Sequence, residues 1–310
     1  ATRPAATTAA TPTTAAAQCQ PAIETRSGGY QFINPLLECD NYRPSTIKTT
    51  ENLEVAIRSY VAESIARNKC RFAAVYLRDL NNGPWIGINE EEIFTPASLL
   101  KVPIMMAVFK KAETEPAFLN KKINYTGRVD IGMAPNIVDQ NILNIGHTYT
   151  IQELTERMIK YSDNEAKELL VNQLGFDHVL AVMRDIGINT NADLSGDFVT
   201  VKVYAGFFKL LYNATYLNRE YSEKALRILA ECDYKQGLVA GLPEGTVVAH
   251  KFGERVYPET GVKQLHECGI VYLQSKPYLL CVMTRGEDFT SLASVISGLS
   301  SLVYNQISSV

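Results

Sequence analysis

The sequence has no apolar segment long enough to span a membrane, no run of basic residues and only one tryptophan. Lys and Arg number 30 against 33 Asp and Glu, and the formal net charge of -3 argues against a nucleic-acid partner. The six cysteines include no C-x-x-C pair, which argues against a zinc site, and we expect no cofactor. What is present, 46% apolar and 20% charged residues in a chain of 310, is typical of one sizeable or two small globular domains.

The N-terminal segment differs in composition from the rest of the chain. Residues 1–17 are almost only Ala, Thr and Pro, with a single charge at Arg3, so they have too few large apolar side chains to form a core. We predict a disordered linker over 1–20 and one folded domain over 21–310. A flexible tether before a folded domain is typical of an exported protein. A natural disordered tail or an artificial start is the alternative interpretation, and neither would indicate export.

The cysteines leave the redox state open, because an even number permits disulfides in several connectivities. Cys268 and Cys281 flank the turn of a predicted hairpin, and their apolar neighbours predict buried thiols. His250 lies on a predicted edge strand, where we expect solvent to reach it. The remaining cysteines are Cys19, Cys39, Cys70 and Cys232.

Apolar periodicity predicts an α/β (α+β) fold. A helix over 51–67 and two strands come first, an all-helical middle follows, and three strands and a last helix over 288–306 end the chain. The predicted strands are 72–80, 85–88, 246–251, 269–273 and 278–284. This order predicts one sheet built from both chain ends, with a helical part of about 95–230 inserted between its strands.

Ser98 and Lys101 form a Ser-x-x-Lys pattern that opens an apolar helical stretch over 99–108. Their spacing places both side chains on one face of a helix. A serine hydroxyl needs a nearby base to become a nucleophile, and a buried lysine loses proton affinity. The pattern occurs again at Ser45 and Lys48, but in a polar setting that would not bury the lysine. Ser98 and Lys101 therefore indicate an activated serine.

Two further motifs follow in order. Ser162, Asp163 and Asn164 lie between two predicted helices, and Lys251 precedes Phe252-Gly253 at the end of a predicted strand. Each motif alone has an ordinary structural interpretation, as a helix start, an N-cap cluster or a strand end. Their order and local context favour a catalytic interpretation.

Together the motifs resemble the S-x-x-K, S-D-N and K-T-G set of class A β-lactamases and penicillin-binding proteins. The resemblance covers about 53–307. It implies a five-stranded antiparallel sheet with helices on both faces, an all-helical subdomain, and a site in the cleft between the two parts.

The resemblance also implies three catalytic roles. Ser98 would attack a β-lactam or D-alanyl-type amide, and Lys101 would accept its proton. Ser162 would pass a proton toward the leaving nitrogen.

Four further residues would bind the substrate. Lys251 would attract a substrate carboxylate and hold Ser162 in place, while Asn164 would hydrogen-bond an amide or the Lys101 ammonium. The backbone at Gly253 and Glu254 would line the site, with the N–H groups of Glu254 and Ser98 forming an oxyanion hole.

Phe252 departs from the family pattern, which has Thr or Ser at this position. The change removes a hydroxyl that normally binds the substrate carboxylate, so Lys251, Arg255 or Arg285 would have to compensate. A phenyl ring at this position favours a different or neutral acyl donor.

The glutamate that drives deacylation in class A enzymes is also missing. The corresponding segment, 187–200, contains no Glu. Asp193 or Asp197 is a possible replacement. Without a positioned base, we expect the acyl-enzyme to hydrolyse slowly, as in penicillin-binding proteins.

Three functions remain open: a β-lactamase-like serine hydrolase, a cell-wall D,D-peptidase or esterase inhibited by β-lactams, and a non-catalytic wall-binding module. The intact motifs argue against the last. We expect a small-molecule β-lactam or peptidoglycan-like amide substrate, an extracytoplasmic location and a monomer.

Overall fold

The computed structural model describes residues 23–40, 47–81, 84–127, 143–190, 194–274 and 276–309. The predicted linker over 1–20, with Cys19, lies outside these residues, as does Ser45. The strands are β1 Ile23–Arg26, β2 Leu36–Asp40, β3 Phe72–Asp79, β4 Trp85–Ile88, β5 Ile93–Phe94, β6 Lys122–Asn124, β7 Thr148–Thr150, β8 Val199–Thr200, β9 Val248–Val256, β10 Lys263–Val271 and β11 Tyr278–Gly286. The α-helices are α1 Ile47–Ala66, α2 Lys101–Thr114, α3 Ile151–Lys160, α4 Asn164–Leu174, α5 Phe176–Asp185, α6 Val201–Asn213, α7 Arg219–Ala230 and α8 Phe289–Ser308. Short 3₁₀ helices are η1 Ala97–Leu100, η2 Pro116–Asn120 and η3 Val239–Gly241.

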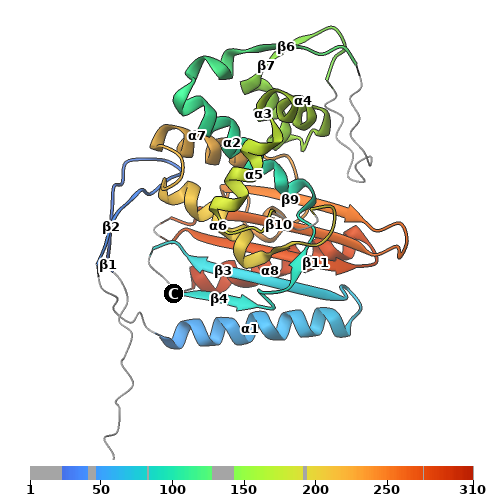
Figure 1. The fold of residues 1–310 in the computed structure, drawn as a ribbon. Coiled ribbons are helices and arrows are strands. Elements are labelled where there is room, and N and C mark those ends of the chain that lie inside the picture. Colours follow the sequence, from blue (N-terminus) through green and yellow to red (C-terminus); the bar gives the residue numbers. More distant parts are fainter. Residues whose placement is uncertain are drawn as a thin grey trace, which may run out of the picture.

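A five-stranded antiparallel sheet is the centre of the molecule (Figure 1). Its strand order is β4-β3-β11-β10-β9, so the first two strands of the sheet in sequence join the last three. The helices α2 to α7 come from the chain between them. The predicted fold class is therefore confirmed.

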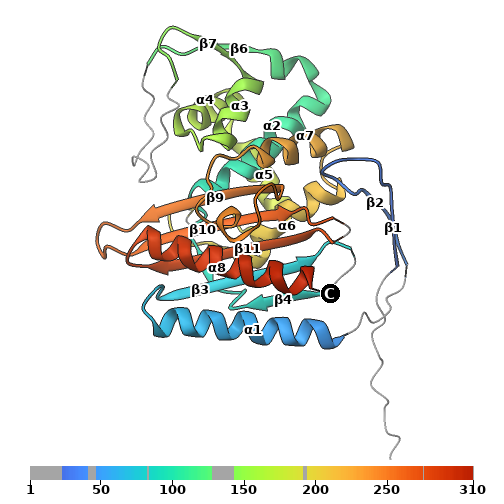
Figure 2. The ribbon, with the colours of Figure 1, turned by 180° about the vertical axis from the view of Figure 1, so that it is seen from behind.

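Helices cover both faces of the sheet. Figure 2 shows α1 and α8 on one side, and the helical part with α6 lies on the other. The core is correspondingly divided into two buried clusters, one on each side of the sheet. The inner strands are buried on both faces, which explains why β3 is a nearly continuous apolar run instead of an alternating one. Among the described residues, no helix combines the length and apolarity that a membrane crossing requires.

Several features of the backbone differ from the sequence prediction. The β1–β2 hairpin was not predicted; the segment that joins its strands contacts α7, where the Glu223 carboxylate accepts hydrogen bonds from the Phe32 and Ile33 N–H groups at 3.0 Å. In addition, β9 continues to Val256, so Lys251 lies in the middle of a strand and not at its end.

The paired state of two cysteines also corrects the prediction. Cys268 and Cys281 face each other in register on β10 and β11, and they are buried as predicted. They form a disulfide instead of remaining thiols. Cys70 and Cys232 are free and buried within the described part of the chain.

Candidate active site

Ser98 lies on η1, a single 3₁₀ turn that leads directly into α2. The sequence predicted an ordinary helix from residue 99, but the chain winds more tightly at this point. Residues three apart eclipse each other in a 3₁₀ turn. The Lys101 amino group consequently lies 2.9 Å from the Ser98 hydroxyl. Ala97 precedes the serine in a left-handed conformation with φ 48°, an uncommon geometry for a residue with a side chain.

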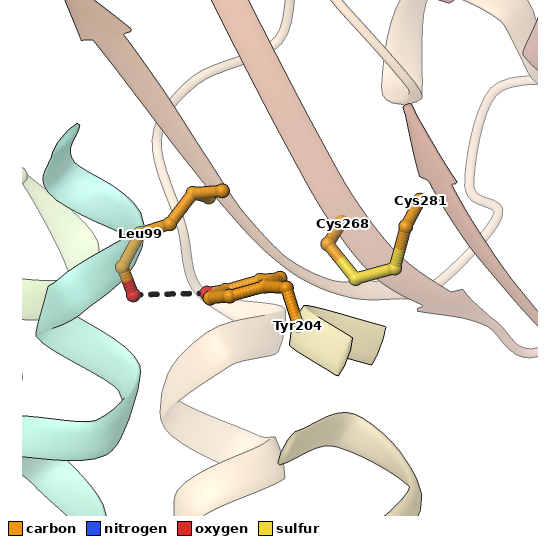
Figure 3. Close-up of a disulfide and its surroundings, with 4 residues drawn as sticks. All are labelled: Leu99, Tyr204, Cys268 and Cys281. Atoms are coloured by element: carbon orange, nitrogen blue, oxygen red, sulfur yellow. Dashed lines mark hydrogen bonds between the residues drawn. A yellow bond between two sulfur atoms is a disulfide. The ribbon is translucent and has the colours of Figure 1, made fainter. Parts of the chain in front are cut away.

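Two contacts hold η1 against the rest of the domain. The buried Tyr204 hydroxyl of α6 donates a hydrogen bond to the Leu99 carbonyl at 2.9 Å, as Figure 3 shows beside the Cys268–Cys281 disulfide. Gly253 of β9 packs against the same turn, because a Cβ at that position would lie 2.8 Å from the Pro96 carbonyl oxygen. Gly253 therefore permits a close approach of two backbones, whatever else it does in the site. Tyr204 was missed by sequence reasoning, because nothing in its local sequence distinguishes it from other apolar positions of α6.

Lys101 is buried at 1% exposure and connects all three polar side chains of the helical side of the site. Besides Ser98, its amino group contacts the Ser162 carbonyl at 2.6 Å, the Ser162 hydroxyl at 3.0 Å and Asn164 Oδ1 at 2.7 Å. Burial, and after it the positive charge of Lys251, hold the pKa of Lys101 well below its usual value.

The contacts of Lys101 limit how its protons are used. The Ser162 carbonyl and Asn164 Oδ1 can only accept, so they take two N–H groups of the amine. In neutral Lys101 these are the only two N–H groups, and the nitrogen lone pair is left for the Ser98 hydroxyl. The geometry thus suits a lysine that accepts a proton from Ser98.

Ser162 is presented by the short connection between α3 and α4. It adopts a left-handed backbone with φ 55°, and Asp163 caps α4 by accepting from the Ala166 N–H at 3.0 Å. Arg157 of α3 forms an ion pair with Asp163 at 3.5 Å. Both charged side chains are mostly buried, so the connection is held from each end. The sequence indicated the cap at Asp163 but not its arginine partner.

Lys251 approaches Ser162 from the sheet. Its buried amino group donates to the Ser162 hydroxyl at 3.0 Å, which places that hydroxyl between two lysines. Burial lowers the pKa of Lys251 to about 8. Ser98 and Ser162 are only half-buried, so their hydroxyls lie at the accessible side of this buried pair of amines. The structure therefore brings together five of the seven predicted site residues, namely Ser98, Lys101, Ser162, Asn164 and Lys251.

The backbone of Glu254, which we expect to supply an N–H to the oxyanion hole, lies on an edge strand of the sheet. β9 pairs only with β10 among the described strands, so its other edge is unpaired. The Phe252 carbonyl accepts from Lys251 Nζ at 2.9 Å and therefore points to that unpaired edge. Because alternate residues of a strand direct their backbone groups to the same side, the Glu254 N–H points there too.

The Asp197 carboxylate is held by three side chains, while Asp193 lies outside the described residues. Asp197 accepts from Tyr257 at 2.5 Å and from Gln264 at 3.2 Å, and it pairs with Arg285 at 3.0 Å. Burial by itself would raise the pKa of Asp197, but these hydrogen bonds and the Arg285 charge outweigh it, so the pKa is lowered. Asp197 is thus an anchor of its loop.

Arg285 and His250 also depart from the predictions. Arg285 cannot readily serve a substrate carboxylate, since it pairs with Asp197 and with Glu92 at 2.6 Å. His250 is fully buried instead of solvated, and its Nδ1 lies 2.6 Å from Glu267. The Leu238 N–H, just before η3, donates to the same Glu267 carboxylate at 2.8 Å. The segment that contains Leu238 therefore packs beside the His250–Glu267 pair. Within the described residues, no group of three or more His, Cys, Asp or Glu could hold a metal ion.

Comparison with known proteins places the chain in a family. Residues 54–307 match the Beta-lactamase enzyme family. The carbapenem-hydrolyzing beta-lactamase KPC of Klebsiella oxytoca is 30% identical over 139 residues, which is 44% of this chain and 46% of that protein. The chain thus spans about half the length of this curated relative.

Solved structures share the fold over most of the chain. The TLA-1 extended spectrum beta-lactamase superposes with a TM-score of 0.71 at 19% identity, covering 84% of this chain and 99% of that one. PBP-A superposes with a TM-score of 0.68 at 23% identity, covering 84% and 97%. Because the family match covers most of the chain and includes every residue of the Ser98 site, the protein belongs to the β-lactamase enzyme family.

Proposed function

We propose that the protein is a serine acyl-transfer enzyme that attacks a β-lactam or a related amide and releases the acyl group slowly. The observation that carries the proposal is the contact of Ser98 with the buried Lys101 amine at 2.9 Å. Because its pKa is held well below the usual value, Lys101 is more often neutral than an exposed lysine and is better suited to take the hydroxyl proton.

In the proposed acylation, Ser98 Oγ forms a bond to the carbonyl carbon while its proton moves to Lys101. The carbonyl oxygen becomes negative, and the backbone N–H groups of Ser98 and Glu254 stabilise it. The first N–H groups of a helical turn have no partner within the turn, which suits Ser98 for this task.

Collapse of the intermediate breaks the carbon–nitrogen bond. Ser162 then donates its hydroxyl proton to the leaving nitrogen and regains one from Lys101, which lies 3.0 Å away. Lys251 orients the Ser162 hydroxyl from the other side. Asn164 holds Lys101 and can also contact an amide of the substrate.

Slow deacylation is supported by the loop before α6. Residues 187–200 contain no Glu, and the carboxylate of Asp197 is occupied by Tyr257, Gln264 and Arg285. A D,D-peptidase or esterase that β-lactams inhibit is the second candidate that this observation favours. A variant of PBP-A has been captured as an acyl-enzyme complex with penicillin G, which is the kind of intermediate proposed here. A location outside the cytoplasm and a monomeric state are part of the same proposal.

Intact-protein mass after incubation with penicillins and cephalosporins tests the function, with Ser98→Ala as the control. We expect an adduct that depends on Ser98 and persists. An adduct that appears and clears while the drug is hydrolysed would contradict slow deacylation. Absence of any Ser98-dependent adduct with β-lactams, esters and D-alanyl peptides would refute the proposal.

A further inference from the structure

Phe252 and Tyr234 form an aromatic stack beside the amino group of Lys251. Their ring centroids lie 4.2 Å apart with the planes inclined by 22°, and each residue is only 6% exposed. Tyr234 follows α7 in the chain, far in sequence from β9. The stack thus fills the position beside Lys251 where family members have a small hydroxyl residue.

The stack changes what Lys251 can offer to a substrate. One N–H of its ammonium group donates to Ser162 and one to the Phe252 carbonyl at 2.9 Å. The Phe252 ring centroid lies 4.1 Å from the nitrogen, close enough for a cation–π contact with the third N–H. An ammonium group has three protons, and all three have partners within the protein. A substrate carboxylate would have to displace one of them.

In the part of the chain that the structure describes, no neighbouring arginine takes the place of Lys251 as a donor to a substrate carboxylate. Arg285 is held by Glu92 and Asp197. Arg255 lies four residues beyond Lys251, which is about 13 Å along a strand, and its guanidinium stacks over a tyrosine ring at 5.1 Å. Glu254, next to the stack, adds a negative charge that acts on Lys251 and repels an anion.

We propose that the Phe252–Tyr234 stack makes the site select acyl donors that lack a carboxylate beside the scissile bond, such as neutral lactams, esters and amides. This inference rests on the proposed acyl transfer from substrate to Ser98 and specifies its substrate class. The ammonium group of Lys251 is buried and its protons already have partners. A carboxylate that moves from water to this group loses its hydration and does not regain all of its hydrogen bonds.

The test compares benzylpenicillin with its methyl ester, which differ only in that carboxylate. The second-order rate of Ser98 acylation is followed by intact-protein mass. We expect the ester to react about 10-fold to 100-fold faster than the free acid, the factor that one hydrogen bond to a charged group carries. A faster reaction of the free acid would overturn the inference while supporting acylation at Ser98.

Two variants at position 252 separate the ring from the hydroxyl. Phe252→Leu removes the cation–π contact but keeps an apolar side chain, so we expect the preference for the ester to shrink. Phe252→Thr also supplies a hydroxyl, and we expect it to favour the free acid. If both variants keep the wild-type preference, the stack does not determine it and the inference is wrong.

Further controls distinguish the alternatives. Tyr234→Leu leaves Phe252 in place and removes its support, so a partial loss of preference is expected even if a position 252 variant fails to fold. If the free acid reacts well and Arg255→Ala abolishes that reaction, Arg255 is the carboxylate partner and the inference fails. Absence of a Ser98-dependent adduct with both compounds and with simple esters would instead refute the acyl transfer itself.

Discussion

Asn164→Asp places a carboxylate where the amide oxygen now lies 2.7 Å from Lys101 Nζ. The substitution preserves size and adds one negative charge beside the proposed base. Unit charges 4 Å apart attract by about 4 kcal/mol at an effective dielectric constant of about 20. The charged form of Lys101 is stabilised, and at any fixed pH the ratio of neutral to charged amine falls by about 100-fold or more.

Only the neutral amine can accept the Ser98 proton. Acylation by a neutral lactam or ester should therefore slow by this full factor at a pH where Lys101 is mostly charged in both proteins, and by less where the wild-type amine is already neutral. In wild type, burial keeps the pKa of Lys101 well below its usual value, and the rate should rise with pH only through a depressed midpoint. In Asn164→Asp, that rising part of the pH–rate profile should move to higher pH. The rate is measured from pH 5 to pH 10 by intact-protein mass.

Asn305→Asp is the matched control, because it adds the same charge to an exposed position on α8. It should leave the profile unchanged. A wild-type rate and profile in Asn164→Asp, in a protein that melts normally, would show that Lys101 is not the base that activates Ser98. The proton transfer would then need another acceptor.

The remaining predictions concern the supports of the site. Gly253→Ala should destabilise the domain by about 1 to 3 kcal/mol in thermal melts and slow acylation, whereas Gly206→Ala, whose Cβ would meet only a side chain at 3.5 Å, should do neither. Tyr204→Phe removes the hydrogen bond to the Leu99 carbonyl and should cost about 1 kcal/mol; an unchanged melting temperature would contradict this role. Asp197→Asn should lower stability without lengthening the acyl-enzyme lifetime, and a trapped adduct would restore Asp197 as a base. Because hydrogen bonds and a paired arginine lower the pKa of Asp197 against the effect of burial, its contribution is present above the ordinary Asp pKa and is lost as pH falls through the lowered value.

The sequence by itself predicted the fold class and several residues that the structure brings together in the candidate site. Apolar periodicity depends on local geometry, since strands repeat every two residues and helices every 3.6, so the element order could be derived without tertiary contacts. The capping box that Thr150 and Glu153 form at the start of α3 is likewise a contact between residues three apart in the chain. The spacing of Ser98 and Lys101 lies within one turn, so their contact could also be anticipated. Only the tighter 3₁₀ winding of that turn was missed.

Contacts between distant segments were decided by the tertiary structure. Lys101 and Asn164 are far apart in sequence, and only the packing of α2 against α4 brings their side chains together. The same holds for Phe252 and Tyr234, which stack only in the folded chain. The sequence shows that Phe252 replaces the family's Thr or Ser, but not that Tyr234 packs against it beside Lys251. No local pattern specifies which aromatic residue will lie opposite another after folding.

The partners of ionisable and sulfur-containing residues also could not be derived from the sequence alone. The chemistry of Asp197 depends on Tyr257, Gln264 and Arg285, which come from other elements of the fold. Cys268 and Cys281 were identified as buried from their apolar neighbours, but their bond depends on the register of β10 against β11. Sequence thus determined which residue types were available and which local elements they form. Tertiary structure determined their burial, their partners and therefore their protonation and bonding, because those depend on groups that only folding brings close.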